Sequence, residues 1–141
     1  MLEIYFKECL YFTANRLSRI ISKMADDEFA PTGLSPTSAF LMMTVLENEG
    51  ISQKDICQVL HLQPSTITRL IASLEAKGYL YSRSEGRMSL IFATDLGRDI
   101  ESQIHECWHK LRQRYNTILK SQDDELSLQL YEVSNRLEDI K

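Results

Sequence analysis

The chain contains 141 residues with a net charge of −4, and 43% of its residues are apolar while 26% are charged. This length and composition predict one globular domain with a hydrophobic core, and the acidic balance argues against a protein that coats nucleic acid without specificity. The first residues lack a basic region followed by an apolar stretch, and no apolar run is long enough to cross a bilayer, so we expect neither a signal peptide nor a membrane segment.

The first predicted element is a long helix over residues 3–27, in which apolar residues recur every three or four positions. A loop rich in proline and glycine breaks this helix. Ser35 is then expected to cap a second helix, which opens with Pro36 and runs to about Asn48.

Two short helices joined by a tight turn follow. Ser52 and Asp55 form an acidic variant of the capping box and mark the start of the first helix, which is expected to end near His61. Pro64 is the expected first residue of the second helix, and Gly78 ends it. This arrangement is the signature of a helix-turn-helix motif.

A β-hairpin is predicted next, with strands at residues 79–83 and 88–93 and a glycine-containing turn between them. Glu85 is expected to brace Arg87 at the tip of this hairpin through an ion pair. A helix-turn-helix followed by a hairpin is a winged helix. The predicted fold class is therefore mainly α, a winged helix-turn-helix of three helices and a hairpin wing, flanked by long helices.

The C-terminal region reads as two more helices. Thr94 is expected to cap a helix over residues 95–119, and Ser121 and Asp124 are expected to cap the last one. The apolar residues of the last helix follow the spacing of a coiled-coil seam, and they are Leu126, Leu130, Val133, Leu137 and Ile140. A domain this small cannot bury both terminal arms by itself, so the arms are predicted to pair in a dimer.

The segment PSTITRLIASLEAKGYL has two unlike faces. Ile67, Leu70, Ile71 and Leu74 form the apolar face. The opposite face is small, hydrogen-bonding and almost free of acids, with Ser65, Thr66, Thr68, Arg69, Ala72 and Ser73. Residues 52–98 hold six cations and four acids, a local charge of +2, so the remainder carries −6. The pattern indicates a face that enters the major groove of DNA, and a generic helix with a Ser/Thr face is the alternative.

Four segments, LSPTSAFLMMTVL (34–46), ISQKDICQVLHLQPSTITRLIASLEAKGYL (51–80), the wing ending at Arg87, and TDLG (94–97), together resemble those of the MarR family of bacterial transcription regulators. The resemblance implies a cytoplasmic homodimer on double-stranded DNA, most simply a repressor released by a small-molecule effector, with no cofactor and no enzymatic activity. A two-fold dimer predicts a palindromic operator with half-sites ~34–36 Å apart.

The resemblance divides the chain into an N-terminal dimerisation helix (1–30), a winged-helix DNA-binding region (34–97) and C-terminal dimerisation helices (98–141), intertwined as one domain. Two features depart from the family pattern. The wing is shorter than usual, and Gln63 stands where many members have an Asp or Ser that caps the recognition helix.

The predicted DNA contacts are Ser52, Gln53, Ser65, Thr66, Thr68, Arg69, Ser73, Lys77 and Arg87. The family places an effector crevice between its dimerisation and DNA-binding parts, and the candidates to line it here are Phe12, Arg16, Phe40, Met43 and Trp108. For any one of these residues, an ordinary place in the core is the alternative.

Three cysteines at wide spacing, without a CxxC motif, favour reduced thiols in the cytoplasm. The stretch ECLYFTANR is similar to the region of the reactive cysteine in the organic-hydroperoxide sensors of the family, which makes Cys9 a possible oxidant sensor. Its tyrosine spacing differs from theirs, and a cysteine that simply packs as a small hydrophobe is the alternative.

His105 and His109 share one helix face, but two ligands make a poor metal site, so no metal is expected. The alternative from another functional class is a winged-helix module that binds proteins and has lost its DNA contact. The short wing and the acidic balance of the chain favour that alternative.

Overall fold

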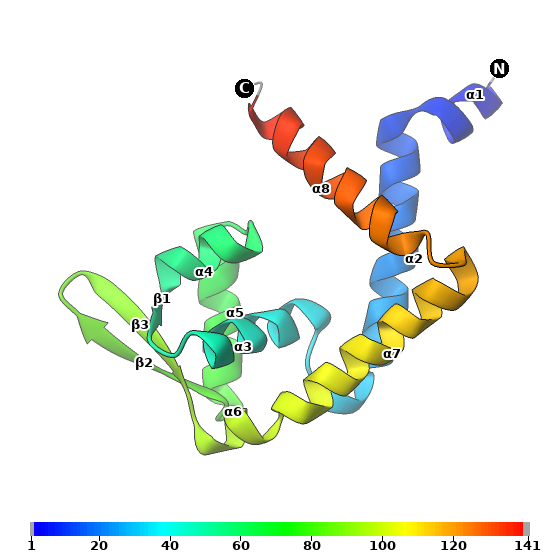
Figure 1. Ribbon diagram of the computed structural model, residues 1–141. Helices are drawn as coiled ribbons and strands as arrows, with labels where there is room; N and C mark the ends of the chain where they lie inside the picture. The colour runs from blue at the N-terminus through cyan, green and yellow to red at the C-terminus, as the bar shows by residue number, and fades with distance from the viewer. Residues whose placement is uncertain (1, 140–141) are drawn as a thin grey trace.

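The structure is a computed structural model that describes residues 2–139, and it is mainly helical with a small antiparallel sheet. Its elements are α1 (Leu2–Glu8), α2 (Leu10–Phe29), the 3₁₀ turn η1 (Ala30–Thr32), α3 (Pro36–Glu47), β1 (Ile51–Ser52), α4 (Gln53–Leu60), α5 (Pro64–Ala76), β2 (Leu80–Glu85), β3 (Met88–Ala93), α6 (Asp95–Asp99), α7 (Glu101–Leu119) and α8 (Asp123–Asp139). The predicted winged helix-turn-helix with long flanking helices is confirmed (Figure 1). Ile140, predicted to end the coiled-coil seam, lies outside the described residues.

A compact lobe is built by α3, α4, α5, α6 and the sheet, whose strand order is β1-β3-β2 with both pairs antiparallel. Its fully buried side chains include Leu41, Met42, Val45, Ile56, Ile67, Leu74 and Ile91. Each buried aliphatic side chain contributes roughly 1.5–3 kcal/mol, so this core fixes α5 against the sheet. The strand β1 was not predicted, because two residues are too few for an alternating pattern.

Local capping chemistry places the helices of the lobe as expected. The Ser35 hydroxyl accepts a hydrogen bond from the Ser38 N–H (3.1 Å), and the Ser52 hydroxyl accepts one from the Asp55 N–H (3.1 Å). His61 ends α4 in the left-handed conformation, with φ of 54°. The turn to α5 is thus short and defined.

The predicted single N-terminal helix was wrong at Cys9, which is extended (ψ 115°) and separates α1 from α2. Residues six apart on a straight helix point to different sides, whereas the break brings the rings of Phe6 and Phe12 to 4.9 Å between centroids. Since α1 buries no residue of its own, nothing else in the chain holds it in line with α2.

The predicted helix over residues 95–119 is also divided, at Ile100, into α6 and α7. Ile100 is buried, so the division anchors α6 to the lobe while α7 leaves it. Gly97 of α6 lies directly against the backbone carbonyl of Tyr79, where a larger residue would collide. Only a glycine therefore fits at this position of α6.

The start of the last helix differs from the prediction. Lys120 and Ser121 both have positive φ, 54° and 68°, and form a left-handed turn, so Ser121 caps nothing. The helix α8 begins at Asp123, and Asp124 instead forms an ion pair with Arg112 (3.3 Å) on α7. This pair helps hold α8 to α7.

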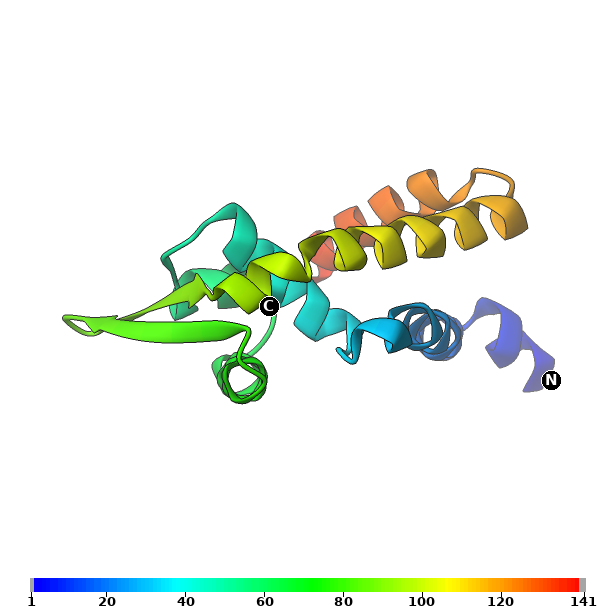
Figure 2. The ribbon, with the colours of Figure 1, turned by 90° about the horizontal axis from the view of Figure 1, so that it is seen from below.

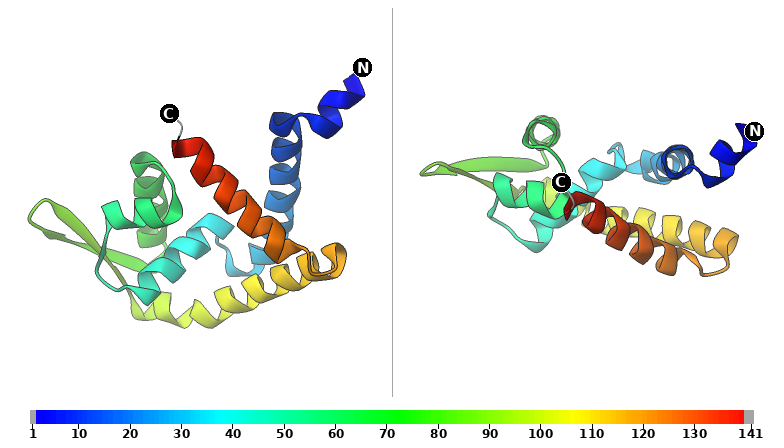
Figure 3. Two further views of the ribbon diagram at one scale, coloured as in Figure 1. Left: turned by 45° about the horizontal axis from the view of Figure 1, so that its top comes forward. Right: turned by 90° about the horizontal axis from the view of Figure 1, so that it is seen from above.

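The terminal helices form two arms beside the lobe. α2 and α7 lie side by side, and α8 turns back from the end of α7 at an open angle, with its C-terminal end on the side of the lobe (Figures 2 and 3). Neither α1 nor α8 contains a buried residue. Within residues 2–139, no helix combines the length and apolarity needed to cross a membrane.

Candidate nucleic-acid interface

The helix α5 presents the face that its sequence predicted. Ile67, Ile71 and Leu74 are buried beneath it, while the outward side chains are exposed. The exposed predicted contacts are Ser65, Thr68, Arg69 and Ser73, and Thr66 is half-buried. Among the residues described, Arg69 takes part in no ion pair. Its guanidinium therefore keeps all of its donors for an outside acceptor such as a base edge or a phosphate.

The first turn of α5 is open at its N-terminus. Gln63 occupies the capping position, but its side chain makes no capping hydrogen bond, as the sequence indicated. The first N–H groups of the helix therefore lack a side-chain acceptor. Such groups, at the positive end of the helix dipole, suit a phosphate oxygen.

A hydrogen bond links the two helices of the motif at the exposed surface. The Gln53 Nε2 donates to the Thr68 hydroxyl (2.6 Å), and that hydroxyl donates to the Pro64 carbonyl (2.9 Å). The start of α4 is thereby joined to the second turn of α5, and two of the predicted contacts lie side by side.

Two other predicted phosphate contacts have structural partners. Ser52 is only 6% exposed, and its hydroxyl caps α4. Its side chain therefore does not reach the surface, contrary to the prediction of a DNA contact. The Lys77 ammonium donates to the Gly33 carbonyl (3.0 Å) across the loop that precedes α3. Lys77 remains exposed, but this bond holds it at the end of α5.

The wing is a tight hairpin. Glu85 pairs with Met88 across the strands, which leaves Gly86 and Arg87 as a two-residue turn, shorter than the predicted turn at residues 84–87. Gly86 has a φ of 63°, the left-handed conformation that a glycine at the first turn position supplies. Arg87 is exposed at the tip. The expected ion pair with Glu85 was wrong, since the ion pairs of the described residues do not include Glu85 and Arg87.

One face of the wing is hydrogen-bonded to α5, and its opposite face carries stacked aromatic rings. The Ser82 hydroxyl donates to the Glu75 carboxylate of α5. On the opposite face, Tyr81 stacks on Phe92 (5.3 Å between ring centroids), and the Arg83 guanidinium lies 4.8 Å from the Phe92 ring centre. The Ser82 bond thus links the wing directly to α5.

Glu49 and Thr94 join separate segments of the lobe through hydrogen bonds. The Glu49 carboxylate accepts from the Ala93 N–H (2.8 Å) and from Arg98 (2.8 Å), and Arg98 also contacts Asp95 (3.0 Å). Partial burial alone would raise the pKa of Glu49, but these hydrogen bonds and the Arg98 charge outweigh it and lower that pKa. The Thr94 hydroxyl donates to the Gly78 carbonyl (2.6 Å) and accepts from the Gly97 N–H (3.0 Å).

The predicted effector-crevice residues are dispersed within the single chain. Phe40 contacts Phe29 at 6.3 Å between ring centroids, near the C-terminal end of α2. Phe12 and Arg16 lie in the first two turns of α2, so Phe12 is separated from Phe29 by roughly 25 Å of helix. Met43 and Trp108 pack against the core, and the Arg112 guanidinium lies over the ring of Trp108. One chain therefore does not gather all five residues in a common crevice.

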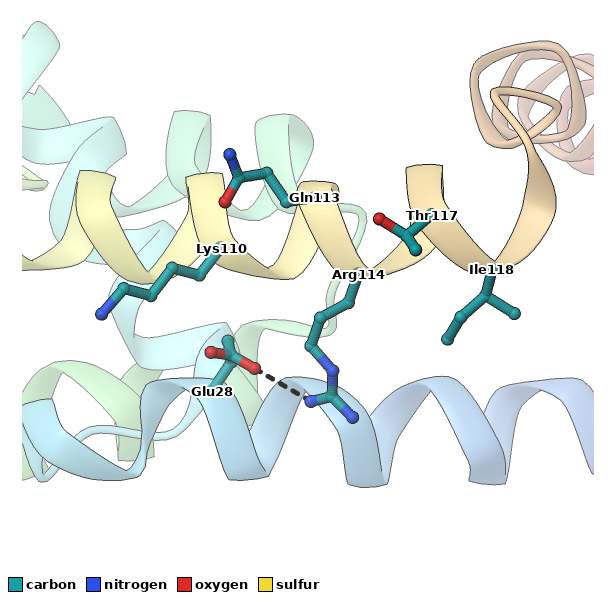
Figure 4. Close-up of a pocket in the computed structure, with 6 residues that line it drawn as sticks. All are labelled: Glu28, Lys110, Gln113, Arg114, Thr117 and Ile118. Carbon is teal, nitrogen blue, oxygen red and sulfur yellow. Dashed lines mark hydrogen bonds and ion pairs between the residues drawn. The ribbon is translucent and has the colours of Figure 1, made fainter.

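A different hollow, of about 410 Å³, lies between α2 and α7 and was not predicted (Figure 4). Its lining residues are Glu28, Lys110, Gln113, Arg114, Thr117 and Ile118. Glu28 and Arg114 form an ion pair across it (2.9 Å), 86 residues apart in the chain. Lys110 is paired with Glu106 (3.2 Å), so the acids and cations around this hollow largely neutralise one another.

The cysteine and histidine candidates are distributed separately. Cys9 is half-buried at the break between α1 and α2, and Thr13 bonds its carbonyl. Burial raises the pKa of the Cys107 thiol, which disfavours its reactive thiolate. His105 lies beside Glu101 (3.7 Å). Among the described side chains, no group of three or more His, Cys, Asp and Glu residues is placed to hold a metal ion.

Known proteins resemble the chain in sequence. Residues 32–87 match the model of the MarR family. The chain is 30% identical over 112 residues to the uncharacterized HTH-type transcriptional regulator YxaD of Bacillus subtilis (strain 168), and the alignment covers 74% of this chain and 76% of YxaD.

Solved structures resemble it in fold. CouR from Rhodococcus jostii RHA1 bound to p-coumaroyl-CoA has a TM-score of 0.71 and 24% identity, covering 86% of this chain and 91% of that one. The transcriptional repressor CouR bound to a 23-mer DNA duplex has a TM-score of 0.78 and 18% identity, covering 94% and 95%. At such identities, these likenesses show a shared architecture of lobe and helical arms.

Proposed function

Because the chain belongs to the MarR family of transcriptional regulators, we propose that it is a homodimeric, sequence-specific DNA-binding repressor whose release is controlled by a small molecule. The exposed face of α5 carries this proposal. It is polar, cationic and nearly free of acids on a chain whose net charge is −4. A face with short donors and one arginine suits the edges of bases in a major groove.

In this proposal, α5 enters the major groove and Arg87 at the wing tip contacts the adjacent minor groove or a phosphate. Ser65, Thr68, Arg69 and Ser73 supply the exposed contacts of α5, while Thr66 and Gln53 flank them. Lys77 approaches a phosphate at the far end of the helix. Base contacts give sequence preference, whereas phosphate contacts give register and affinity.

The arms supply the dimer. The N-terminal helices, within residues 1–30, and the C-terminal helices, within residues 98–141, leave large apolar side chains exposed, among them Leu2, Ile4, Leu128 and Leu137. A single chain offers nothing to cover them, and a second copy would bury both sets at once. Two lobes related by a two-fold axis then meet two half-sites one helical turn apart.

Effector binding would act through the relative position of the two lobes. CouR has been crystallised both with p-coumaroyl-CoA and with a DNA duplex, so that fold accommodates a small molecule and DNA. For this chain, Phe12 lies near the start of α2 while Phe40 and Trp108 lie on α3 and α7, and a dimer would allow residues of the two copies to complete one crevice. A ligand that prefers the DNA-incompetent spacing shifts the population and releases the DNA.

Selection from a random duplex pool tests this proposal. Full-length protein is used to recover bound duplexes, and affinity for the recovered sequence is compared with that for a scrambled duplex over a range of salt concentrations. We expect a palindrome with half-sites about 10 base pairs apart and an affinity that falls with salt. Recovery of no preferred sequence, or binding to protein partners that high salt leaves intact, would favour the protein-interaction alternative.

The oxidant-sensor alternative has one supporting observation, which is the position of Cys9 at the break between α1 and α2. A sulfenic acid there is larger and polar, so it would alter the angle of an arm that the dimer needs. One equivalent of organic hydroperoxide should then weaken operator binding reversibly, and Cys9→Ser should abolish that effect. If the oxidant does not change operator binding, Cys9 is a packing residue.

A further inference from the structure

We propose that Gln53 and Thr68 form one recognition unit, in which Gln53 locks Thr68 so that its methyl group selects thymine in each half-site. The inference rests on the proposed DNA-binding function and adds to it a base preference and the residue that imposes it. Thr68 is the contact residue, and Gln53 is a positioning residue that acts through it.

The hydrogen of the Thr68 hydroxyl is already used. A threonine hydroxyl has one hydrogen to donate and two lone pairs to accept with. The Pro64 carbonyl, 2.9 Å away, can only accept, so the hydrogen of Thr68 is directed to it. Thr68 therefore has no donor left for DNA.

The same network fixes the side-chain amide of Gln53. The Gln53 amide lies 2.6 Å from the Thr68 oxygen. If the amide oxygen faced Thr68, two acceptors would compete for one hydrogen, so the Nε2 must face it and donate. This bond occupies one of the lone pairs of Thr68 and restrains rotation of its side chain.

What remains of Thr68 for a partner is mostly its methyl group. Thr68 is exposed, and its oxygen is covered by Pro64 on its own helix and by Gln53 from α4. Guanine offers two acceptors in the major groove, which a side chain without a donor cannot satisfy. Thymine offers a methyl group there, and contact between a threonine methyl and a thymine methyl is a favourable apolar contact. The geometry therefore favours thymine over guanine opposite this residue.

Removing single methyl groups from the operator tests the inference. After an operator has been selected, each thymine is replaced in turn by deoxyuridine, which differs only by lacking the methyl group. Binding of full-length protein is measured for every replacement. One thymine in each half-site should show a loss of about fourfold, as expected for one buried methyl group.

Four variants assign that loss to residues. Thr68→Val keeps the methyl group and should retain the deoxyuridine penalty, whereas Thr68→Ser removes the methyl group and should abolish it. Thr66→Ser makes the same chemical change on the same helix and should leave the penalty unchanged. Gln53→Met removes the donor and should reduce the penalty, because only the bond to the Pro64 carbonyl then restrains the Thr68 side chain.

The outcomes separate this inference from the proposed function. If no operator can be selected, the DNA-binding proposal fails. If an operator is found but deoxyuridine weakens binding nowhere, or equally in wild type and Thr68→Ser, DNA binding stands and the recognition unit is overturned. If Gln53→Met weakens the thymine and deoxyuridine operators by the same factor, Gln53 is a phosphate contact and not a positioning residue.

Discussion

The lobe and the arms of this molecule are held together in different ways. In the lobe, large aliphatic side chains such as Val45, Ile56 and Ile67 are fully buried, and the exposed face of α5 is polar. In the arms, Leu128 and Leu137 remain 57% and 59% exposed. The lobe thus has a buried core of its own, whereas the arms leave large apolar side chains exposed among residues 2–139.

The largest expected effect comes from placing charges on that arm surface. Leu130→Asp combined with Leu137→Asp should convert a dimer into monomers, because buried unpaired carboxylates are costly. Losing the second half-site should weaken operator binding by about 100-fold or more. Sedimentation at micromolar concentration and DNA titration measure the two effects. Gln58→Asp adds a charge at an exposed position of α4, outside the arms, and serves as the control for sedimentation. A double variant that stays dimeric would contradict the arm assignment.

The next effect tests the polar face of the lobe. Arg69→Ala should weaken binding to the selected operator by ~1–3 kcal/mol if its free guanidinium contacts a base. Its affinity for a scrambled duplex should change less. Arg19→Ala removes an exposed arginine from α2 and should leave both affinities unaltered. Should Arg69→Ala bind the operator as wild type does, Arg69 would not belong to the interface.

A smaller change is expected at the tip of the wing. Arg87→Ala should remove one phosphate contact from each half-site, which lowers the slope of log affinity against log salt by ~0.9 per contact. The slope is obtained from titrations at several salt concentrations. Lys110→Ala, which removes a cation from α7, is the matched control. An unchanged slope for Arg87→Ala would mean that the short wing stays clear of the DNA.

The smallest effect concerns the pH dependence of stability in the lobe. The pKa of Glu49 is lowered in the fold, so its contribution is fully present above the unfolded value of 4.5 and is lost as the pH falls through the lower folded value. Arg98→Gln should therefore flatten the loss of stability on acidification below that value. Urea unfolding at pH 7 and at several pH values below 4.5 measures this change, with Arg136→Gln on α8 as control. Parallel pH profiles for wild type and Arg98→Gln would rule out the Glu49 contribution.

Sequence patterns predicted the lobe well because its signals are local. The spacing of Ile67, Ile71 and Leu74 correctly indicated the buried face of α5, and Ser35 and Ser52 correctly marked two helix starts. The same locality explains the errors. Apolar periodicity continues through Cys9 and Ile100, so nothing in the pattern indicated that the helices divide there.

The candidate site was predicted in its residue types but not in its internal contacts. Exposure of Thr68 and Arg69 follows from helical spacing, whereas the bond from Gln53 to Thr68 depends on how two helices cross. The Glu28–Arg114 pair joins residues 86 apart, and no local pattern signals such a contact. The crevice residues could not be placed from one chain, since Phe12 and Arg16 lie near the start of α2, whereas the other three lie on α3 and α7.

The hydroxyl of Thr94 has a consequence for how the lobe opens. By bonding both the Gly78 carbonyl and the Gly97 N–H, it joins the end of α5 to the start of α6 through a single atom. The backbone adds a second link, because the Thr94 N–H donates to the Tyr79 carbonyl (3.1 Å). Amide protons at the end of α5 and in α6 should therefore exchange with solvent in one cooperative event, and α5 shares its local unfolding free energy with the segment that leads to the arms.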